Sequence, residues 1–300
     1  SRNERVQVHL TVVRFSTELI EGIHFEAVLL KVLTFLESSS LVREISLGPV
    51  LRHSATQYGH TNLGPGKMPS PQAGVDYAVV GIVDGGVSKH KSLTPWRTGG
   101  IEYMKQSDDL RGHGTFIAGL LVNGLAFNPG QPLDSEPCKF FDFDLYSEDE
   151  DLFNANFEKG FIDMVQQLDT ELADKPDEVR VVNMSLCQEQ LTDPGSYSWE
   201  AALLDELADK HNVIFVLAAG NLEGELARPR WPIDPTKALN QIATYAFQGQ
   251  DRVHEPGGSA RNLTVGALEL FDAEGLTRPA RYTRRGPATS AGVKPDFAHI

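Results

Sequence analysis

Two residues whose side chains can share a proton lie at the ends of predicted elements. Asp84 ends an apolar run, Tyr77–Val83, and two glycines follow it. His113 lies 29 residues further on, between two glycines, where we expect a helix to begin. A carboxylate can fix the tautomer of a histidine and stabilise the imidazolium that forms when the ring takes a proton. Alone, Asp84 is typical of a turn and His113 of a surface or capping position; only together do they suggest a base oriented by a carboxylate.

Two more polar segments follow apolar runs. Asn221 comes shortly after Val213–Ala218. Asn is common in turns, but its side-chain NH2 can also donate to an oxyanion during acyl transfer. Ser185 and Leu186 end the run Val179–Leu186. We expect a free strand edge there, to which an extended peptide can pair through main-chain hydrogen bonds.

The elements that must position these residues alternate from residue 75 onward. We expect strands at 77–83, 139–145, 179–186, 213–218 and 261–270, and helices at 116–125, 155–172 and 199–211. Strands alternating with helices of this length predict an α/β fold, a doubly wound parallel sheet with helices on both faces. In such sheets the functional groups gather beyond the carboxyl ends of the strands.

The first 74 residues have a different texture. Residues 6–14 alternate apolar and polar side chains as in a strand, 25–36 have helical spacing, and 41–47 resemble a second strand. We therefore expect a small α+β unit at residues 1–50. Residues 51–74, rich in Gly, Pro, Ser and Asn from about His53, are expected to be a linker or arm before the large domain at 75–300.

Composition excludes several functions. The chain has 300 residues and a formal net charge of −14, and no run of five basic residues, so we expect no nucleic-acid partner. The sequence contains no stretch of 18 apolar residues, so we expect no membrane span. The two cysteines, Cys138 and Cys187, form no disulfide framework and favour a reducing compartment.

The start is neither Met nor a signal peptide, so we expect both ends to be fragment boundaries.

The ordered set of motifs resembles the subtilisin-like serine proteases, or subtilases. The segments that carry the resemblance, within about residues 77–297, are GIVDGG, GHGTFIAG, VVNMSL, LAAGN, and YTRRGP followed by KPD. The resemblance implies a subtilisin-like fold and a serine endopeptidase that acts on polypeptides through a Ser/His/Asp triad. It assigns Asp84 and His113 to the triad, Asn221 to the oxyanion hole, and Ser185-Leu186 to substrate pairing.

Three positions depart from the family pattern. Gly85 stands where the family has Ser or Thr, so any hydrogen bond from that hydroxyl is absent. Cys187 replaces the glycine of the SLG segment; we expect it to pack in or narrow the pocket, without a catalytic role, because no His motif adjoins it. Ser290 lies in a partial match to the family's GTSxAxP, but between RGP and KPD, and Gly292 and Pro295 then oppose the required helix.

The nucleophilic serine is therefore expected beyond Ile300, in a segment that the large domain lacks here. Without that segment we expect the chain to be inactive by itself, and to need something that fills the gap left by a buried helix. An alternative from a different class is a catalytically inactive, protease-derived module that binds or regulates peptides. A GTSxAxP-like segment after Ile300 would favour the enzyme, and its absence the module.

Other expectations depend on the resemblance alone. The DGG variant and the GLL after HGTFIA are similar to an intracellular bacterial branch, which implies a cytoplasmic location and an AAA-type ATPase partner. Residues 1–50 are compatible with a propeptide or an accessory unit. We predict no cofactor and no metal ligand; subtilases often hold structural calcium, but no ligand set can be identified from the spacing. No HExxH is present, and Gly64–Lys67 lacks the spacing of a phosphate loop.

Overall fold

The computed structural model describes residues 25–39, 51–53, 68–127, 136–270, 277–286 and 292–299. The chain divides into two compact units, Ser1–Gly48 and Pro49–Ile300. In the first unit, helix α2 (Phe25–Glu37) confirms the helix expected at 25–36. The strands expected at 6–14 and 41–47 lie outside the described residues.

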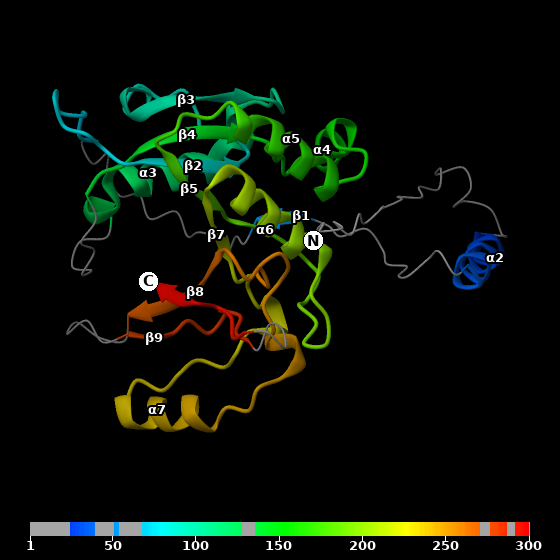
Figure 1. Ribbon diagram of the computed structural model, residues 1–300. Coiled ribbons are helices and arrows are strands. Elements are labelled where there is room, and N and C mark those ends of the chain that lie inside the picture. The colour runs from blue at the N-terminus through cyan, green and yellow to red at the C-terminus, as the bar shows by residue number, and fades with distance from the viewer. Residues whose placement is uncertain are drawn as a thin grey trace, which may run out of the picture. The chain divides into compact units, whose positions relative to one another are not determined.

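A mostly parallel sheet forms the centre of the second unit (Figure 1). In spatial order its strands are β10 (Phe297–His299), β8 (Leu263–Leu270), β7 (Ile214–Ala218), β5 (Val179–Met184), β2 (Val79–Asp84), β4 (Lys139–Asp144) and β3 (Arg97–Glu102). Each neighbouring pair in this order is parallel. Only β9 (Thr277–Pro279), which pairs with β8, is antiparallel among the described strands of this sheet. The prediction of a doubly wound parallel sheet is confirmed.

Helices connect successive strands, as the right-handed crossing of parallel strands requires. They are α3 (Gly112–Phe127), α4 (Glu150–Asn156), α5 (Phe161–Ala173), α6 (Trp199–His211) and α7 (Pro235–Thr244). The single helix expected at 155–172 is wrong: the chain leaves α4 at Phe157 and begins α5 after Gly160, whose φ is +59°. A right-handed helix requires a negative φ at every residue, so the positive φ of Gly160 interrupts it there. Strand β3 and helix α7 were not expected from the sequence.

The two faces of the sheet bury separate hydrophobic clusters. On β2, Val83 belongs to a large cluster with residues of α4, α5 and α6, while the preceding Ile82 belongs to a smaller one with Ala118 and Val122 of α3. Successive side chains of a strand point to opposite faces, so one apolar run supplies both clusters. Both faces of the sheet are therefore covered by helices, as predicted.

Strand order reverses at β2, which lies between β4 and β5. The chain runs from β2 to β3 and β4 on one side, and then to β5 and β7 on the other. At such a switch point the loops after neighbouring strands diverge and leave a crevice beyond the carboxyl ends. Asp84 is the last residue of β2 and lies at this crevice.

The run expected as one strand at 179–186 is interrupted at Ser185. It contains β5 and the short β6 (Leu186–Gln188), which leaves the large sheet and pairs antiparallel with β1 (Leu51–His53). The expectation of a free edge at Ser185-Leu186 is therefore wrong for Leu186, which pairs with His53 of β1; Ser185 lies just outside this pair. Residues 51–53, expected in a linker, form that strand.

Candidate active site

The predicted acid–base pair forms in the structure. Nδ1 of His113 lies 2.7 Å from Oδ2 of Asp84. Asp84 is fully buried, and its other oxygen, Oδ1, accepts a hydrogen bond of 2.8 Å from the backbone amide of Gly85. This arrangement holds a carboxylate against one ring nitrogen of His113, so that the tautomer carrying its proton on Nδ1 is favoured and Nε2 can accept a proton.

Two glycines allow the first turn of α3 to approach the turn after β2. A Cβ at Gly114 would lie 2.4 Å from the carbonyl oxygen of Gly86, which no side chain tolerates. Gly86 itself has φ +80°. Gly114 and Gly86 thus allow the start of α3 to lie close to the turn after β2, which brings the two catalytic candidates together.

A buried polar network supports this turn. Nε2 of Gln106 donates to the carbonyl oxygens of Gly85 and Tyr146, each at 2.7 Å, and to Oδ1 of Asp144 at 3.1 Å. Arg111, which precedes α3 directly, donates to Oδ2 of Asp144 at 3.1 Å. Gln106 also accounts for Gly85: a Cβ there would lie 3.1 Å from its Nε2. A side chain at position 85 would therefore crowd this network.

Neighbouring carboxyls in this network are electrostatically unusual. Burial raises the pKa of Asp142 to about 7, although Arg97 lies 3.0 Å away and the amide of Val87 donates to it. Burial also raises the pKa of Asp144, against the opposing charge of Arg111. Desolvation outweighs the arginines because both carboxylates are fully withdrawn from water.

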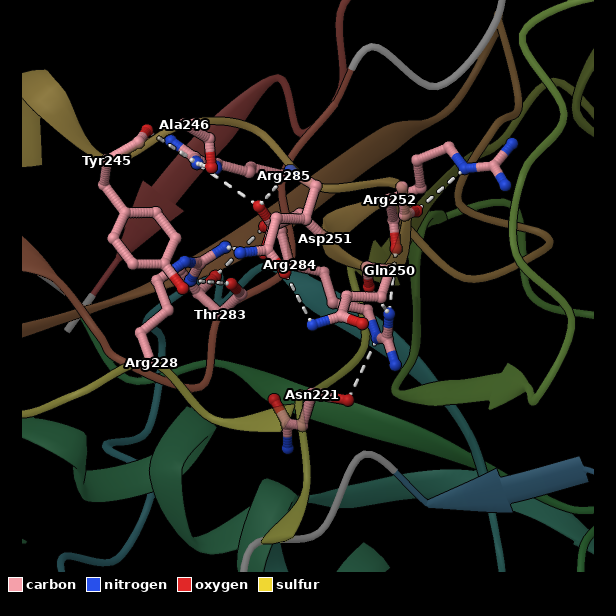
Figure 2. Close-up of polar contacts among 12 residues, drawn as sticks. Asn221, Arg228, Tyr245, Ala246, Gln250, Asp251, Arg252, Thr283, Arg284 and Arg285 are labelled. Atoms are coloured by element: carbon pink, nitrogen blue, oxygen red, sulfur yellow. Dashed lines mark hydrogen bonds and ion pairs between the residues drawn. The ribbon is translucent and has the colours of Figure 1, made fainter. Parts of the chain in front are cut away.

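Asn221 lies across the crevice from His113. It follows β7 through Ala219 and Gly220, whose φ is +85°, and forms an isolated antiparallel bridge with Thr283. Its carbonyl oxygen accepts a hydrogen bond of 2.9 Å from Nε of Arg284. In Figure 2 the side-chain amide of Asn221 points away from this contact. The backbone carbonyl of Asn221 is thus fixed by Arg284, while its side-chain amide points in a different direction.

His113 and Asn221 line the same cavity, whose volume is about 220 Å³. The remaining lining residues are Ile117, Ser185, Ala218, Ala219, Gly220, Val265, Gly266, Ala267, Tyr282 and Thr283. Ser185 was predicted to lie at the site and does; its hydroxyl donates to Oδ1 of Asn183 at 3.1 Å. Leu186 does not line the cavity: it is fully buried in the large core and pairs with His53.

Cys187 has a histidine neighbour in space that the sequence did not indicate. Its Sγ lies 3.6 Å from Nδ1 of His254, and both residues are buried. Burial raises the pKa of Cys187 to about 12 and lowers the pKa of His254 to about 3, to which the charge of Arg284 also contributes. Both groups are neutral near pH 7, so this pair lacks the thiolate that a cysteine nucleophile needs.

Sequence reasoning missed the residues that brace the site. Gln106 lies in no motif, and His254 lies in a segment without apolar periodicity. Val265–Ala267 was expected only as a strand, although it lines the cavity. The one available signal was Arg284, which belongs to the YTRRGP segment used for the family resemblance.

The described residues contain neither a metal-binding cluster nor a membrane-spanning helix. No group of three or more His, Cys, Asp or Glu side chains there could hold a metal ion. No helix in the described part of the chain is both long and apolar enough to cross a bilayer. Residues 289–291, which include Ser290, lie outside the described residues.

Comparison with known proteins gives both sequence and structural matches. One curated relative, "Uncharacterized protein y4bN" of Sinorhizobium fredii (strain NBRC 101917 / NGR234), is 28% identical over 127 residues, which cover 38% of this chain and 28% of that protein. The chain thus spans about a quarter of this relative.

Two solved structures illustrate the structural matches. The patellamide maturation protease PatA is 18% identical, with a TM-score of 0.43, over 73% of this chain and 69% of that chain. A cold-adapted subtilisin-like serine proteinase is also 18% identical, with a TM-score of 0.41, over 74% of this chain and 62% of that chain.

The family model for the subtilase family, Peptidase_S8, matches residues 76–299, which is most of the chain and contains Asp84, His113 and Asn221. The protein belongs to the subtilase family.

Proposed function

We propose that this protein is a serine endopeptidase in which Asp84 and His113 act on a serine supplied from outside these 300 residues. The observation that carries the proposal is the pair of groups facing one cavity: the Asp84–His113 hydrogen bond of 2.7 Å on one side and Asn221 on the other. Family membership supports a peptidase, and the pair supplies the acid–base half of a triad.

The chemistry follows from the two groups. Nε2 of His113 takes the proton of the serine hydroxyl as its oxygen attacks the peptide carbonyl, and Asp84 stabilises the imidazolium. The side-chain NH2 of Asn221 donates to the oxyanion of the tetrahedral intermediate. His113 then gives its proton to the leaving amine, and water repeats the sequence on the acyl-enzyme.

A fluorophosphonate probe on the full-length protein tests the proposal. We expect labelling of one serine, abolished in His113→Ala. His211→Ala is a matched control, because Nε2 of His211 also lies against a carboxylate, Oδ1 of Asp169 at 2.6 Å, but between α5 and α6 and not at the cavity. Labelling that survives His113→Ala, or none in the wild-type protein, would rule out the serine peptidase.

A second candidate function is a peptide-binding module that does not cleave. It is favoured by the β1–β6 pair, in which an extended segment occupies the edge where a substrate is expected. Under this proposal the full-length protein binds extended peptides but gives no probe labelling. The AAA-type ATPase partner, the cytoplasmic location and a propeptide role for residues 1–50 stay predictions from the family resemblance.

A further inference from the structure

We propose that the site accepts only glycine or alanine at the residue whose carbonyl faces Asn221, because Cys187 and His254 fill the space that a larger side chain would need. This inference rests on the proposed function. It concerns which peptides are cleaved, whereas the proposed function concerns whether cleavage occurs.

The β1–β6 pair shows how an extended peptide can lie along β6. Its register pairs Leu51 with Gln188, Arg52 with Cys187 and His53 with Leu186. The strands are antiparallel, so a peptide in this register that continues past the position of His53 brings its next residue opposite Ser185. Ser185 lines the cavity together with His113 and Asn221. The residue opposite Ser185 is therefore the one whose carbonyl can be attacked.

The register also fixes the direction of that residue's side chain. Directly opposed residues of an antiparallel pair place their side chains on the same face, and every second residue of a strand shares a face. Ser185 directly precedes β6, so continuing the alternation of that strand by one residue places the side chain opposite Ser185 on the face that carries Cys187.

That face is filled. Sγ of Cys187 lies 3.6 Å from Nδ1 of His254, and their exposed fractions are 4% and 9%. The same edge of the imidazole lies against Gly220, where a Cβ would lie 2.9 Å from Nδ1. The imidazole thus occupies the space between β6 and the turn that carries Asn221, and neither Cys187 nor His254 lines the cavity.

The backbone behind His254 is fixed on both sides. Its amide donates to the carbonyl of Ala219 at 3.1 Å, and it forms an antiparallel bridge with Leu191. The next residue, Glu255, accepts a hydrogen bond of 2.7 Å from the amide of Gln188. Moving His254 aside would break contacts to both β6 and the end of β7.

Arg284 closes the wall from the remaining direction. A Cβ at Gly220 would lie 3.0 Å from its Cδ. Its guanidinium donates to the carbonyls of Asn221, Gln250 and Arg252, as Figure 2 shows. A leucine or phenylalanine side chain of the substrate would have to displace this braced wall, and inserting methylenes into a packed site is unfavourable.

The test compares full-length protein on four fluorogenic peptides, Ala-Ala-Ala-Xaa-aminomethylcoumarin, with Xaa as Gly, Ala, Leu or Phe. We expect kcat/KM for Ala to exceed that for Leu and Phe by at least about 10-fold, the scale of an overpacking penalty. His254→Gly and Cys187→Gly should each raise the Phe/Ala ratio of kcat/KM by about 10-fold or more. Cys138→Gly, at the other free cysteine and away from the cavity, should leave the ratio unchanged.

Several outcomes would overturn the inference. The inference is wrong if the wild-type protein cleaves the Phe peptide as readily as the Ala peptide. It is also wrong if a variant that is folded, as its thermal transition shows, has an unchanged Phe/Ala ratio of kcat/KM. If His254→Gly fails to fold, Cys187→Gly and Cys187→Ala carry the test. If no peptide is cleaved and no serine is labelled, the proposed function fails instead. The same four peptides are then compared by binding to His113→Ala protein, where equal affinities for Ala and Phe reject the inference.

Discussion

Nε2 of Gln106 donates a hydrogen bond of 2.7 Å to the carbonyl oxygen of Gly85, the residue that follows Asp84. This contact joins the segment before α3 to the turn after β2, and so fixes the elements that carry His113 and Asp84 relative to each other. Gln106 is buried, so its donor has no water to replace a lost partner.

Gln106→Leu should lower the free energy of unfolding by at least about 2 kcal/mol, because it leaves buried acceptors at Gly85, Tyr146 and Asp144 without this donor. Gln188→Leu is the matched control. Gln188 is equally buried, and neither its Nε2 nor its Oε1 has a hydrogen-bond partner among the described residues, so its loss should leave stability unchanged or raised. Denaturant unfolding of the full-length protein measures both. Equal destabilisation by the two variants would show that Gln106 acts only through packing.

Asp84→Asn should reduce kcat by about 10⁴-fold with little change in KM, because an amide favours the wrong tautomer of His113. Initial rates of peptide cleavage by the full-length protein, measured over a range of substrate concentrations, give both kcat and KM. Asp169→Asn, in the carboxylate–histidine pair between α5 and α6, should leave kcat within about two-fold. A similar loss in both variants would mean that the effect comes from folding, not from the site.

The sequence indicated Asp84 and Asn221 because each follows an apolar run, and His113 because it opens an expected helix; all three belong to compact motifs. Parallel strands bring their carboxyl ends to one edge, which groups such residues. It could not indicate the contacts of Gln106, His254 or Arg284, although Arg284 belongs to the YTRRGP segment. Their partners Gly85, Cys187 and Asn221 lie 21, 67 and 63 residues away in the chain. Contacts at such separations depend on how loops pack, which no local periodicity encodes.

The elements of the fold likewise include some that the sequence predicts and some that it does not. The parallel sheet could be predicted because strands covered on both faces are continuous apolar runs. Strand β3, with the residues RTGGIE, has no such run, and the segment of α7 leaves the apolar side chains of Ile233 and Leu239 exposed. The pairing of β1 with β6 was hidden because three-residue strands are too short for a periodic pattern.

Asn221→Ala should lower kcat by about 10²–10³-fold through loss of an oxyanion donor. Arg284→Ala should lower kcat by up to about 10²-fold without touching substrate, because it releases the carbonyl of Asn221 from the segment 250–252. The double variant should resemble Asn221→Ala alone, since Arg284 acts through Asn221. Arg284→Lys should not restore kcat, because an ammonium cannot reproduce the planar fork. Fully additive losses in the double variant would contradict this coupling.

The buried His254 should make stability depend on pH. Its folded pKa is about 3 and its ordinary value 6.5, so between these values the unfolded state binds the extra proton. Stability from this group is complete above pH 6.5 and is lost as pH falls toward 3, by about 2 kcal/mol between pH 7 and 5. Denaturant unfolding of the full-length protein at both pH values should show this loss shrinking in His254→Gln. An identical pH dependence in the two proteins would show that folding does not shift the pKa of His254.

Strand β1 should compete with substrate for β6, because both need the same backbone edge. Proline removes a backbone donor, and the amides of adjacent strand residues point to opposite sides, so only one of Arg52→Pro and His53→Pro removes a donor that faces β6. That variant should raise kcat/KM for a short peptide by about 5–10-fold through a lower KM, the equivalent of one hydrogen bond. The other proline serves as its control, together with Arg52→Ala, which keeps the amide.

If neither proline changes KM, a peptide does not need the edge that β1 occupies. The register argument for Cys187 and His254 would then lose its starting point, although the peptide series would still decide that inference independently.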